Sequence, residues 1–375
     1  MTQRVIFVEP LGVIGGMGHY TDALVSAYAA EGMPVRVVTT SASSELHRVA
    51  EVRISRAYRL AVRRGFPAVV RAAAYVLGHL RTLVACRPGD ILVVHFMHAP
   101  SIDLWWLRAL RGRRVTVVLL AHDPVPVTRG GLHRRYRECL SQAHVLVVHG
   151  PTARNDLLNL GVPEARVVVA PFGRFRAVRP MSRPVACRLL AISELPRPVV
   201  AIIGHMKPGK GIGRVLTSLA HAPGAIGTLL LAGASQGDPG LETAVAAARN
   251  RGTPIQRVDR RLTDAQELAA YSLADVVLAV YETGYSSGVV ARAHAVGRRV
   301  VLTNVGDLPL QARVGDVVLE PSYSPSALIS AILQEPEPAA HSDGARQQEP
   351  DPGWRDHVRA VVAAISRLPH SMDAR

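Results

Sequence analysis

Short runs of apolar, β-branched residues recur along this chain, and segments of helical length separate them. In the first half the runs lie at Val5–Val8, Val35–Val38, Ile91–Val94, Val115–Leu120, Val145–Val148 and Val167–Ala170. Strands that are apolar on both faces and alternate with helices are typical of a parallel sheet covered by helices on both sides. The pattern therefore predicts a doubly wound α/β fold.

The pattern stops near Pro171–Arg174, gives way to a segment rich in proline and arginine, and then starts again. The second series of predicted strands lies at Val199–Ile203, Thr228–Ala232, Pro254–Val258, Val276–Val280 and Val300–Leu302, with Val317–Leu319 as a closing strand. A chain of 375 residues exceeds what one core usually fills. We therefore expect two Rossmann-like domains whose binding loops face one cleft.

The expected domains are residues 1–173, residues 174–350, and a C-terminal segment, 351–375, that packs back on the first domain. The pattern indicates a last helix from about Trp354 to Leu368. Glu335–Gly353 is polar and holds four prolines, so we expect a mobile loop there.

The only two lysines of the chain, Lys207 and Lys210, lie in one loop, although the sequence has 44 lysines and arginines in total. A loop that keeps lysine twice in an arginine-rich chain indicates a need for a compact ammonium group. An apolar strand precedes the loop and a helical pattern follows it from Ile212. Strand, glycine-rich loop and helix is an arrangement that binds phosphate, although an ordinary surface turn is the alternative.

The formal net charge of +15 favours an acidic partner. From Val52 to Gly89 there are eight arginines and no acidic residue. Arg53, Arg56, Arg59 and Arg63 have helical spacing, which predicts a basic amphipathic helix that could contact an anionic membrane. A solvated basic face is the alternative. Nucleic acid is not an expected partner, because no helix-turn-helix, aromatic RNA platform or zinc finger is recognisable.

The three cysteines match neither a disulfide framework nor a zinc pattern. The first apolar stretch contains Glu9 and Pro10, which argues against a signal peptide, and no uninterrupted apolar run is long enough to span a membrane. We expect a cytoplasmic protein that is at most peripheral to the inner face of the plasma membrane.

Several segments together resemble the family 4 glycosyltransferases. Lys207–Gly211 is similar to the family's lysine loop, and Tyr281–Val290, Ala295–Val301 and Asn304–Pro309 are similar to its donor-binding signature. Thr152–Pro163, leading to Val169–Gly173, resembles its inter-domain junction, and Gly15–Gly18 fits the loop after the first strand. The resemblance implies the GT-B fold, with two facing Rossmann-like domains.

The resemblance also implies a nucleoside-diphosphate-sugar donor in the C-terminal domain. Lys207 and Lys210 would contact its diphosphate, and Ser287 with the N–H groups of Gly288 and Val289 would bind phosphate at a helix N-terminus. Plain helix capping is the alternative role for Ser287. The remaining candidate donor residues are Gly15, Gly16, Tyr281, Glu282 and Ser286. No cofactor beyond the donor and no metal is expected.

The predicted catalytic residues are His122, which resembles a family histidine near the donor sugar, and its neighbour Asp123. A structural histidine in a turn is the alternative for His122. His19, His95 and His98 are the candidates on the acceptor side.

Three positions depart from the family pattern. Gly284 and Arg292 stand where many members carry two glutamates, and His205 stands where other branches carry an arginine. These departures leave the sugar and ribose contacts open.

The resemblance predicts a retaining glycosyltransferase. Its acceptor would be a lipid-linked glycan, or a soluble acceptor such as a natural-product aglycone. Two other classes stay open: a non-catalytic protein that binds nucleotide sugars or polyanions, and a nucleotide-sugar epimerase. An epimerase would need paired carboxylates, for which Asp123 and Glu282 are the candidates.

Overall fold

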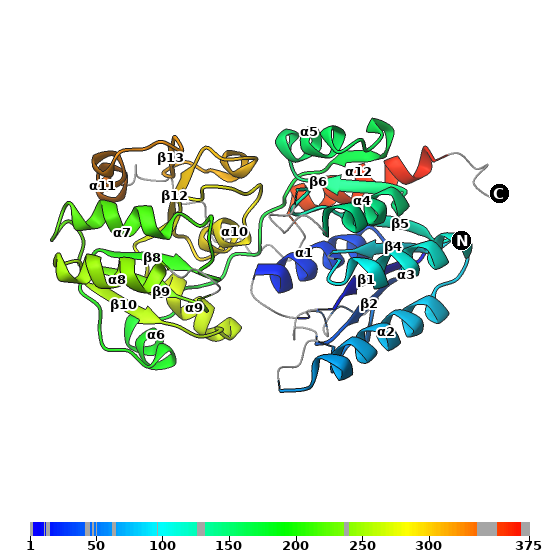
Figure 1. Ribbon diagram of the computed structural model, residues 1–375, viewed down its shortest axis with the longest axis horizontal. Helices are drawn as coiled ribbons and strands as arrows, with labels where there is room; N and C mark the ends of the chain where they lie inside the picture. Colours follow the sequence, from blue (N-terminus) through cyan, green and yellow to red (C-terminus); the bar gives the residue numbers. More distant parts are fainter. Residues whose placement is uncertain are drawn as a thin grey trace. The chain divides into compact units, whose positions relative to one another are not determined.

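The computed structural model describes residues 3–10, 12, 16–41, 46, 49, 51–61, 65–95, 97–125, 132–235, 240–335 and 351–368. The chain divides into two compact units (Figure 1). Unit 1 comprises Met1–Gly173 with Gln348–Arg375, and unit 2 comprises Arg174–Gln347. Each unit is built on its own parallel sheet, which confirms the predicted α/β class.

In unit 1 the described residues form a seven-stranded parallel sheet in the order β3-β2-β1-β4-β5-β6-β7. Its strands are β1 (Val5–Glu9), β2 (Val35–Thr39), β3 (Val52–Ser55), β4 (Ile91–Val94), β5 (Thr116–Leu120), β6 (Val145–Val148) and β7 (Val167–Val169). Its helices are α1 (Gly16–Ala30), α2 (Ala68–Ala85), α3 (Pro100–Gly112), α4 (Leu132–Gln142), α5 (Pro151–Asn159) and α12 (Pro352–Ser366). Helices α2, α3 and α4 contact one another in series, and α1 contacts α12.

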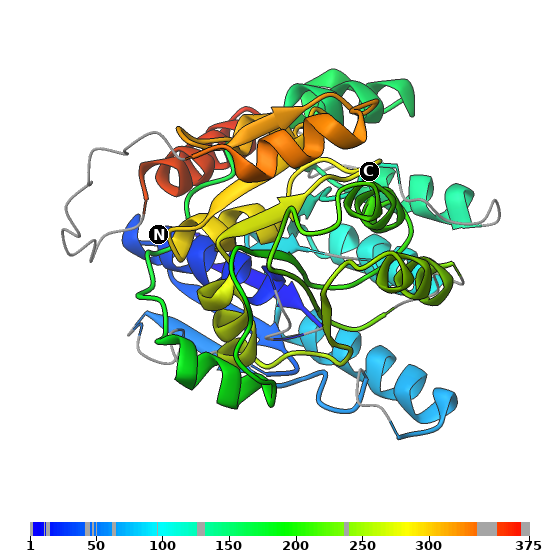
Figure 2. The ribbon, with the colours of Figure 1, turned by 90° about the vertical axis from the view of Figure 1, so that its left-hand side faces the viewer.

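In unit 2 the described residues form a six-stranded parallel sheet in the order β10-β9-β8-β11-β12-β13. Its strands are β8 (Val199–Ile203), β9 (Thr228–Ala232), β10 (Ile255–Val258), β11 (Val276–Ala279), β12 (Arg299–Thr303) and β13 (Val317–Leu319). Its helices are α6 (Arg183–Leu190), α7 (Ile212–Ala220), α8 (Leu241–Asn250), α9 (Asp264–Leu273), α10 (Gly288–Ala295) and α11 (Pro325–Leu333). Figure 2 shows these helices on both faces of the sheet.

Strand β8 explains why the unit 2 sheet is apolar on both faces. Successive side chains of a strand point to opposite faces. Val199 and Ala201 join the core that α6, α9 and α10 cover, whereas Val200 and Ile202 join the core under α7, α8 and α11. Burial on both faces produces the continuous apolar runs seen in the sequence.

The predicted helix over Arg53–Arg63 is wrong. Residues Val52–Ser55 form the edge strand β3, which pairs with β2, and turns follow it. Edge-strand side chains are only partly buried, so this strand lacks the apolar run of the central strands. Arg53 lies on this strand and Arg59 on the turns that follow it, whereas Arg63 lies outside the described residues. The helix of this region starts only at Ala68.

The proline-rich segment after Arg174 is not wholly irregular. It contains α6, in which Pro184 occupies the first turn, where a proline needs no N–H partner. The expected mobile loop at Glu335–Gly353 falls largely on residues 336–350, which lie outside the described residues.

The last helix, α12, belongs to unit 1, although nearly the whole of unit 2 separates it from the rest of that unit in the sequence. Trp354 is 1% exposed and packs edge to face on Tyr20, with ring centroids 5.1 Å apart. Its indole lies against Gly173, where an added Cβ would come within 2.4 Å of the ring. The close approach explains the glycine at this position.

Candidate functional site

The lysine loop, residues 204–211, connects β8 to α7 in unit 2. Its backbone turns at Gly204, Gly209 and Gly211, which all have positive φ, a region that glycine adopts without strain. Gly211 is the N-cap of α7, and a Cβ there would lie 2.0 Å from the Val280 carbonyl oxygen. The loop is therefore fitted closely to the segment that follows β11.

Residues 280–289, called the signature loop below, lie against the lysine loop. The Glu282 N–H donates to the Gly209 carbonyl at 2.9 Å. The Lys210 ammonium lies 3.4 Å from the centroid of the Tyr281 ring, a cation–π contact that fixes its position. Lys207 is exposed at the same loop. The structure thus brings Lys210 onto Tyr281, and Lys207 lies in the same loop.

Ser287 does not cap α10 through its side chain. Its hydroxyl lies 3.0 Å from the Tyr281 hydroxyl, and its backbone N–H donates to Gln311 Oε1 at 2.6 Å. The Gln311 amide donates back to the Ser287 carbonyl at 3.2 Å. Gly288 and Val289 are the first residues of α10, where backbone N–H groups lack intrahelical partners. These two N–H groups make the helix N-terminus suitable for an anion.

The lysine loop and the signature loop follow neighbouring strands of the sheet. Strand β8 lies between β9 and β11. After β8 the chain continues to β9 and β10 on one side of it, and then crosses to β11 on the other side. Ligands of doubly wound sheets bind at this switch point, outside the carboxyl ends of the two strands. Unit 2 therefore presents two lysines, glycine-rich backbone and a helix N-terminus where its topology favours a ligand.

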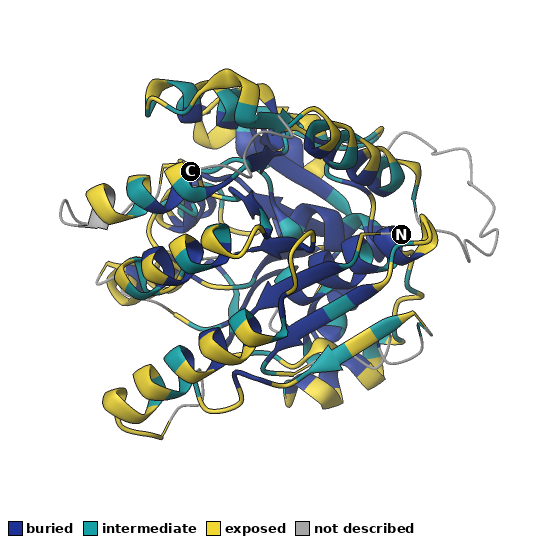
Figure 3. Ribbon diagram, turned by 90° about the vertical axis from the view of Figure 1, so that its right-hand side faces the viewer, coloured by how far each residue is buried: buried dark blue, intermediate teal, exposed yellow. Residues whose placement is uncertain are grey.

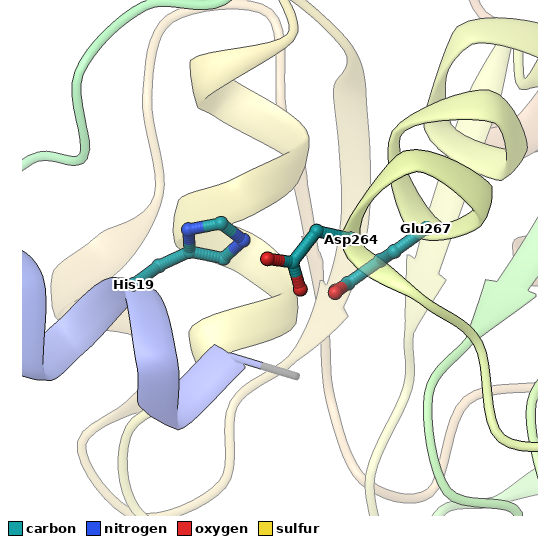
Figure 4. Close-up of side chains that lie close together, drawn as sticks. All are labelled: His19, Asp264 and Glu267. Atoms are coloured by element: carbon teal, nitrogen blue, oxygen red, sulfur yellow. The ribbon is translucent and has the colours of Figure 1, made fainter. Parts of the chain in front are cut away.

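Arg292, at one of the positions that depart from the family pattern, points into unit 2. It is 6% exposed and lies close enough to Glu267 to lower the pKa of that carboxyl. Burial has the larger effect and raises the pKa of Glu267 to about 7. Glu267 shares the first turn of α9 with Asp264 (Figure 4). Arg292 and Glu267 are thus a buried pair in which the charge of Arg292 partly offsets the cost of ionising Glu267.

In unit 1 four histidines form a row at the carboxyl ends of the strands. His95, His122 and His149 follow β4, β5 and β6, and His357 comes from α12. Ring centroids of successive members lie 5.9, 5.9 and 5.6 Å apart. We call these four residues the histidine row. Tyr20 packs edge to face on three of its members.

Hydrogen bonds set the tautomers of two histidines in the row. His149 Nδ1 lies 3.0 Å from the Ala170 carbonyl, and His357 Nδ1 lies 3.2 Å from the Pro171 carbonyl. A carbonyl oxygen only accepts, so both Nδ1 atoms carry the proton. His149 Nε2 lies 3.0 Å from the Tyr20 hydroxyl, so both ring nitrogens of His149 have a hydrogen-bond partner.

Three members of the histidine row, His95, His122 and His357, are neutral at pH 7. Burial lowers the pKa of His95 to about 3, and burial followed by the neighbouring His149 lowers the pKa of His357 to about 3. Burial and the other three histidines also lower the pKa of His122 well below its ordinary value. These three imidazoles are therefore polar groups without a charge.

The structure separates the predicted unit 1 residues. His122 and His95 lie in the histidine row, and His95 Nδ1 is 3.7 Å from Glu9 at the end of β1. His98 lies elsewhere, with its ring 6.3 Å from Tyr75 of α2. His19 is on α1 (Figure 4).

Asp123, the other predicted catalytic residue, is exposed, and its backbone carbonyl accepts the Tyr136 hydroxyl at 3.1 Å. Gly16 starts α1, whereas Gly15 lies outside the described residues.

His149 and His357 belong to the histidine row but were not predicted from the sequence. The signal for His149 was available, because it directly follows the strand Val145–Val148, as His95 and His122 follow theirs. His357 had no such signal, since it reaches the row from the far end of the chain.

Comparison with known proteins gives a family for the first half of the chain. Residues 14–174 match the model of Glycosyltransferase Family 4. The D-inositol 3-phosphate glycosyltransferase of Actinosynnema mirum is 29% identical over 337 residues, covering 81% of this chain and 79% of that protein. The corresponding protein of Mycobacterium ulcerans is 26% identical, covering 81% of this chain and 70% of its own length.

Solved structures show the same fold over nearly the whole chain. Sucrose-phosphate synthase from Thermosynechococcus elongatus has a TM-score of 0.62 at 18% identity, with 97% of each chain covered. Anabaena HepE in complex with UDP-glucose has a TM-score of 0.63 at 14% identity, covering 97% of this chain and 95% of that one. These likenesses confirm the predicted GT-B fold.

Proposed function

We propose that this chain is a family 4 glycosyltransferase, which the family match over residues 14–174 supports, and that it transfers a sugar from a nucleoside-diphosphate donor to an acceptor hydroxyl and retains the anomeric configuration. The donor diphosphate binds unit 2 between the lysine loop and the signature loop. The observation that carries this proposal is the position of Lys210, fixed 3.4 Å over Tyr281 beside the sheet's switch point.

The chemistry of the leaving group explains the residues at this site. Breaking the bond between the anomeric carbon and phosphate leaves a nucleoside diphosphate with an extra negative charge. Two ammonium groups, Lys207 and Lys210, and the N–H groups of Gly288 and Val289 stabilise that charge. The acceptor oxygen bonds to the anomeric carbon on the face that the phosphate leaves, so no side chain has to act as nucleophile. The departing phosphate oxygen takes the acceptor proton, so no side chain has to act as base.

The acceptor site belongs to unit 1, at the end of its sheet that carries the histidine row. Neutral imidazoles orient hydroxyl groups without holding a charge that would compete for the donor phosphates. His122 is the member proposed to approach the reacting centre.

The similarity to D-inositol 3-phosphate glycosyltransferases adds a phosphorylated cyclitol to the lipid-linked and natural-product acceptors considered above. A net charge of +15 suits a phosphorylated acceptor, because the protein's field attracts anions.

The test is a transfer assay with purified protein, UDP-glucose as first donor and inositol 3-phosphate as first acceptor, followed by other nucleotide sugars. Product analysed by NMR should keep the anomeric configuration of the donor. Lys210→Ala should abolish transfer, while the far-UV circular dichroism spectrum of the variant stays that of the wild type. An inverted product would contradict the retaining mechanism. Donor binding without transfer to any acceptor would favour the non-catalytic class.

A further inference from the structure

Helix α2 turns its hydrogen-bonding side chains toward the protein. Its buried face carries Tyr75, His79 and Thr82. The Tyr75 hydroxyl donates to Asp103 Oδ1 at 2.7 Å, and His79 Nε2 lies 2.9 Å from the same oxygen. His79 Nδ1 lies 2.8 Å from the Tyr58 hydroxyl. The network ties α2 to α3 and to the segment after β3.

The outward face of α2 is apolar. Val69 is 79% exposed, Leu77 45%, Leu80 40% and Val84 76%, and Ala73 between them is exposed as well. Their spacing of four, four, three and four residues places all five on one side of the helix. We call these five residues the outer stripe, and Figure 3 shows exposed residues along α2.

The distribution of polar and apolar side chains on α2 is the reverse of that on an ordinary surface helix, which buries its apolar stripe and exposes polar residues. Exposed apolar patches of this kind mark interaction sites. Phe66 and Val70, each 38% exposed, extend the apolar surface at the N-terminal end of the helix. The outer stripe therefore needs a partner that is itself apolar.

The charge around the outer stripe identifies the class of partner. Arg81 on α2 and Arg87 just after its end are exposed, and no acidic residue occurs from Val52 to Gly89. A one-sided basic surface beside an apolar stripe complements the anionic headgroups and acyl chains of a lipid bilayer. A protein partner would have to match the same stripe with an acidic rim.

We propose that the outer stripe of α2 inserts into the interface of an anionic membrane, with the helix lying in the plane of the bilayer. Among the described residues, α2 is the one helix long and apolar enough to cross a membrane. Crossing would break the buried bonds from Tyr75 and His79 to Asp103 and leave those groups in hydrocarbon. A helix that lies on the membrane surface keeps these hydrogen bonds. The proposal does not depend on the transfer reaction.

The test uses vesicles of phosphatidylcholine, with and without phosphatidylglycerol, sedimented with the full chain. The variant Val69→Glu/Val84→Glu changes two side chains that face solvent, so folding should be preserved. Val314→Glu is the matched control, because Val314 is 82% exposed and lies in unit 2. We expect the α2 variant to lose at least about tenfold in partitioning, because it replaces two inserting apolar side chains by charges. The control should bind as the wild type does.

A second variant tests the electrostatic half of the proposal. Arg81→Gln/Arg87→Gln should weaken binding to phosphatidylglycerol vesicles, and added salt should reduce wild-type binding as charge attraction is screened. Equal binding by wild type and Val69→Glu/Val84→Glu would overturn the proposal. Failure of the wild type to sediment would also overturn it, and a concentration-dependent dimer that Val69→Glu/Val84→Glu dissolves would then assign the stripe to a second copy.

Discussion

The two sheets share a strand order around their switch points but present different chemistry at their carboxyl ends. In unit 1 the strands β4, β5 and β6 lead into the histidine row, which packs against the Tyr20 ring. In unit 2 the strands β8 and β11 lead into glycine-rich backbone with two lysines. Matching topology sets where a ligand binds, and the loop residues decide what kind of ligand it is. The difference supports the proposal that the nucleoside-diphosphate donor binds unit 2.

The largest expected effect on stability comes from removing the contact between α12 and the residues around the histidine row. Trp354→Ala removes a fully buried indole that packs on Tyr20, Phe172 and Gly173. We expect a loss of about 3–5 kcal/mol in the free energy of unfolding, as for other buried aromatic residues. Hydrogen exchange should place the loss in unit 1. A loss confined to unit 2 would contradict the position of α12.

The next effect tests the close fit of the lysine loop. Gly211→Ala forces a Cβ toward the Val280 carbonyl at a positive φ, and should cost about 1–3 kcal/mol of unfolding free energy. The control is Gly213→Ala in α7, where an added Cβ meets nothing within 4 Å. That change should be neutral or stabilising, because alanine favours helix. Denaturant midpoints for the two variants measure the contrast, and equal midpoints would refute it.

The histidine row should make unit 1 sensitive to acid. His95 and His357 have folded pKa values of about 3, below the value of about 6.5 expected when unfolded. The unfolded chain therefore binds more protons between these values, so stability is full above about pH 6.5 and falls as the pH drops toward 3. Urea midpoints between about pH 7.5 and pH 5 should show the decline. His357→Gln should reduce its slope, and an unchanged slope would exclude this residue as a cause.

The smallest expected effect concerns the buried pair in unit 2. Burial raises the pKa of Glu267 to about 7. The contribution of Glu267 to the free energy of unfolding is therefore full below about pH 4.5 and is lost as the pH rises through 7. Arg292→Gln removes the charge that lowers this pKa and should enlarge the loss at alkaline pH, by about 1.4 kcal/mol for each unit of pKa shift. Glu267→Gln should remove the dependence. Identical alkaline stability of wild type and Arg292→Gln would show that the pair is not coupled.

The central strands were predictable because burial on both faces left a continuous apolar signal. Strands β4, β6, β8, β9 and β13 occupy the predicted residues. The other predicted strands differ by one residue at one end, or at both ends for β12. The edge strand β3 gave no such signal, since its residues are only partly buried. Helix α6 was missed because a proline in the first turn reads as a break in the pattern.

The candidate site was predictable only in part. Lysine spacing and the resemblance indicated the two loops of unit 2, but no local pattern reveals that Lys210 lies over Tyr281, since that contact depends on neighbouring strands. The histidine row depends on tertiary packing in the same way, because His357 reaches it from α12. The apolar outward face of α2 contradicts the usual rule for surface helices. Such local departures from general rules tend to occur at functional sites.

The most direct test of the central claim is thermal unfolding with UDP, GDP, TDP or ADP, for wild type, Lys210→Ala and the control Arg214→Ala. Arg214 is an exposed cation of α7 that lies over Tyr323. A nucleotide at about 100 times its dissociation constant stabilises by about 2.7 kcal/mol, which gives a measurable rise in Tm. The account predicts that one nucleotide raises the Tm of wild type and Arg214→Ala, but not that of Lys210→Ala. An equal rise in all three proteins, or no rise in any, would contradict a donor site at the lysine loop.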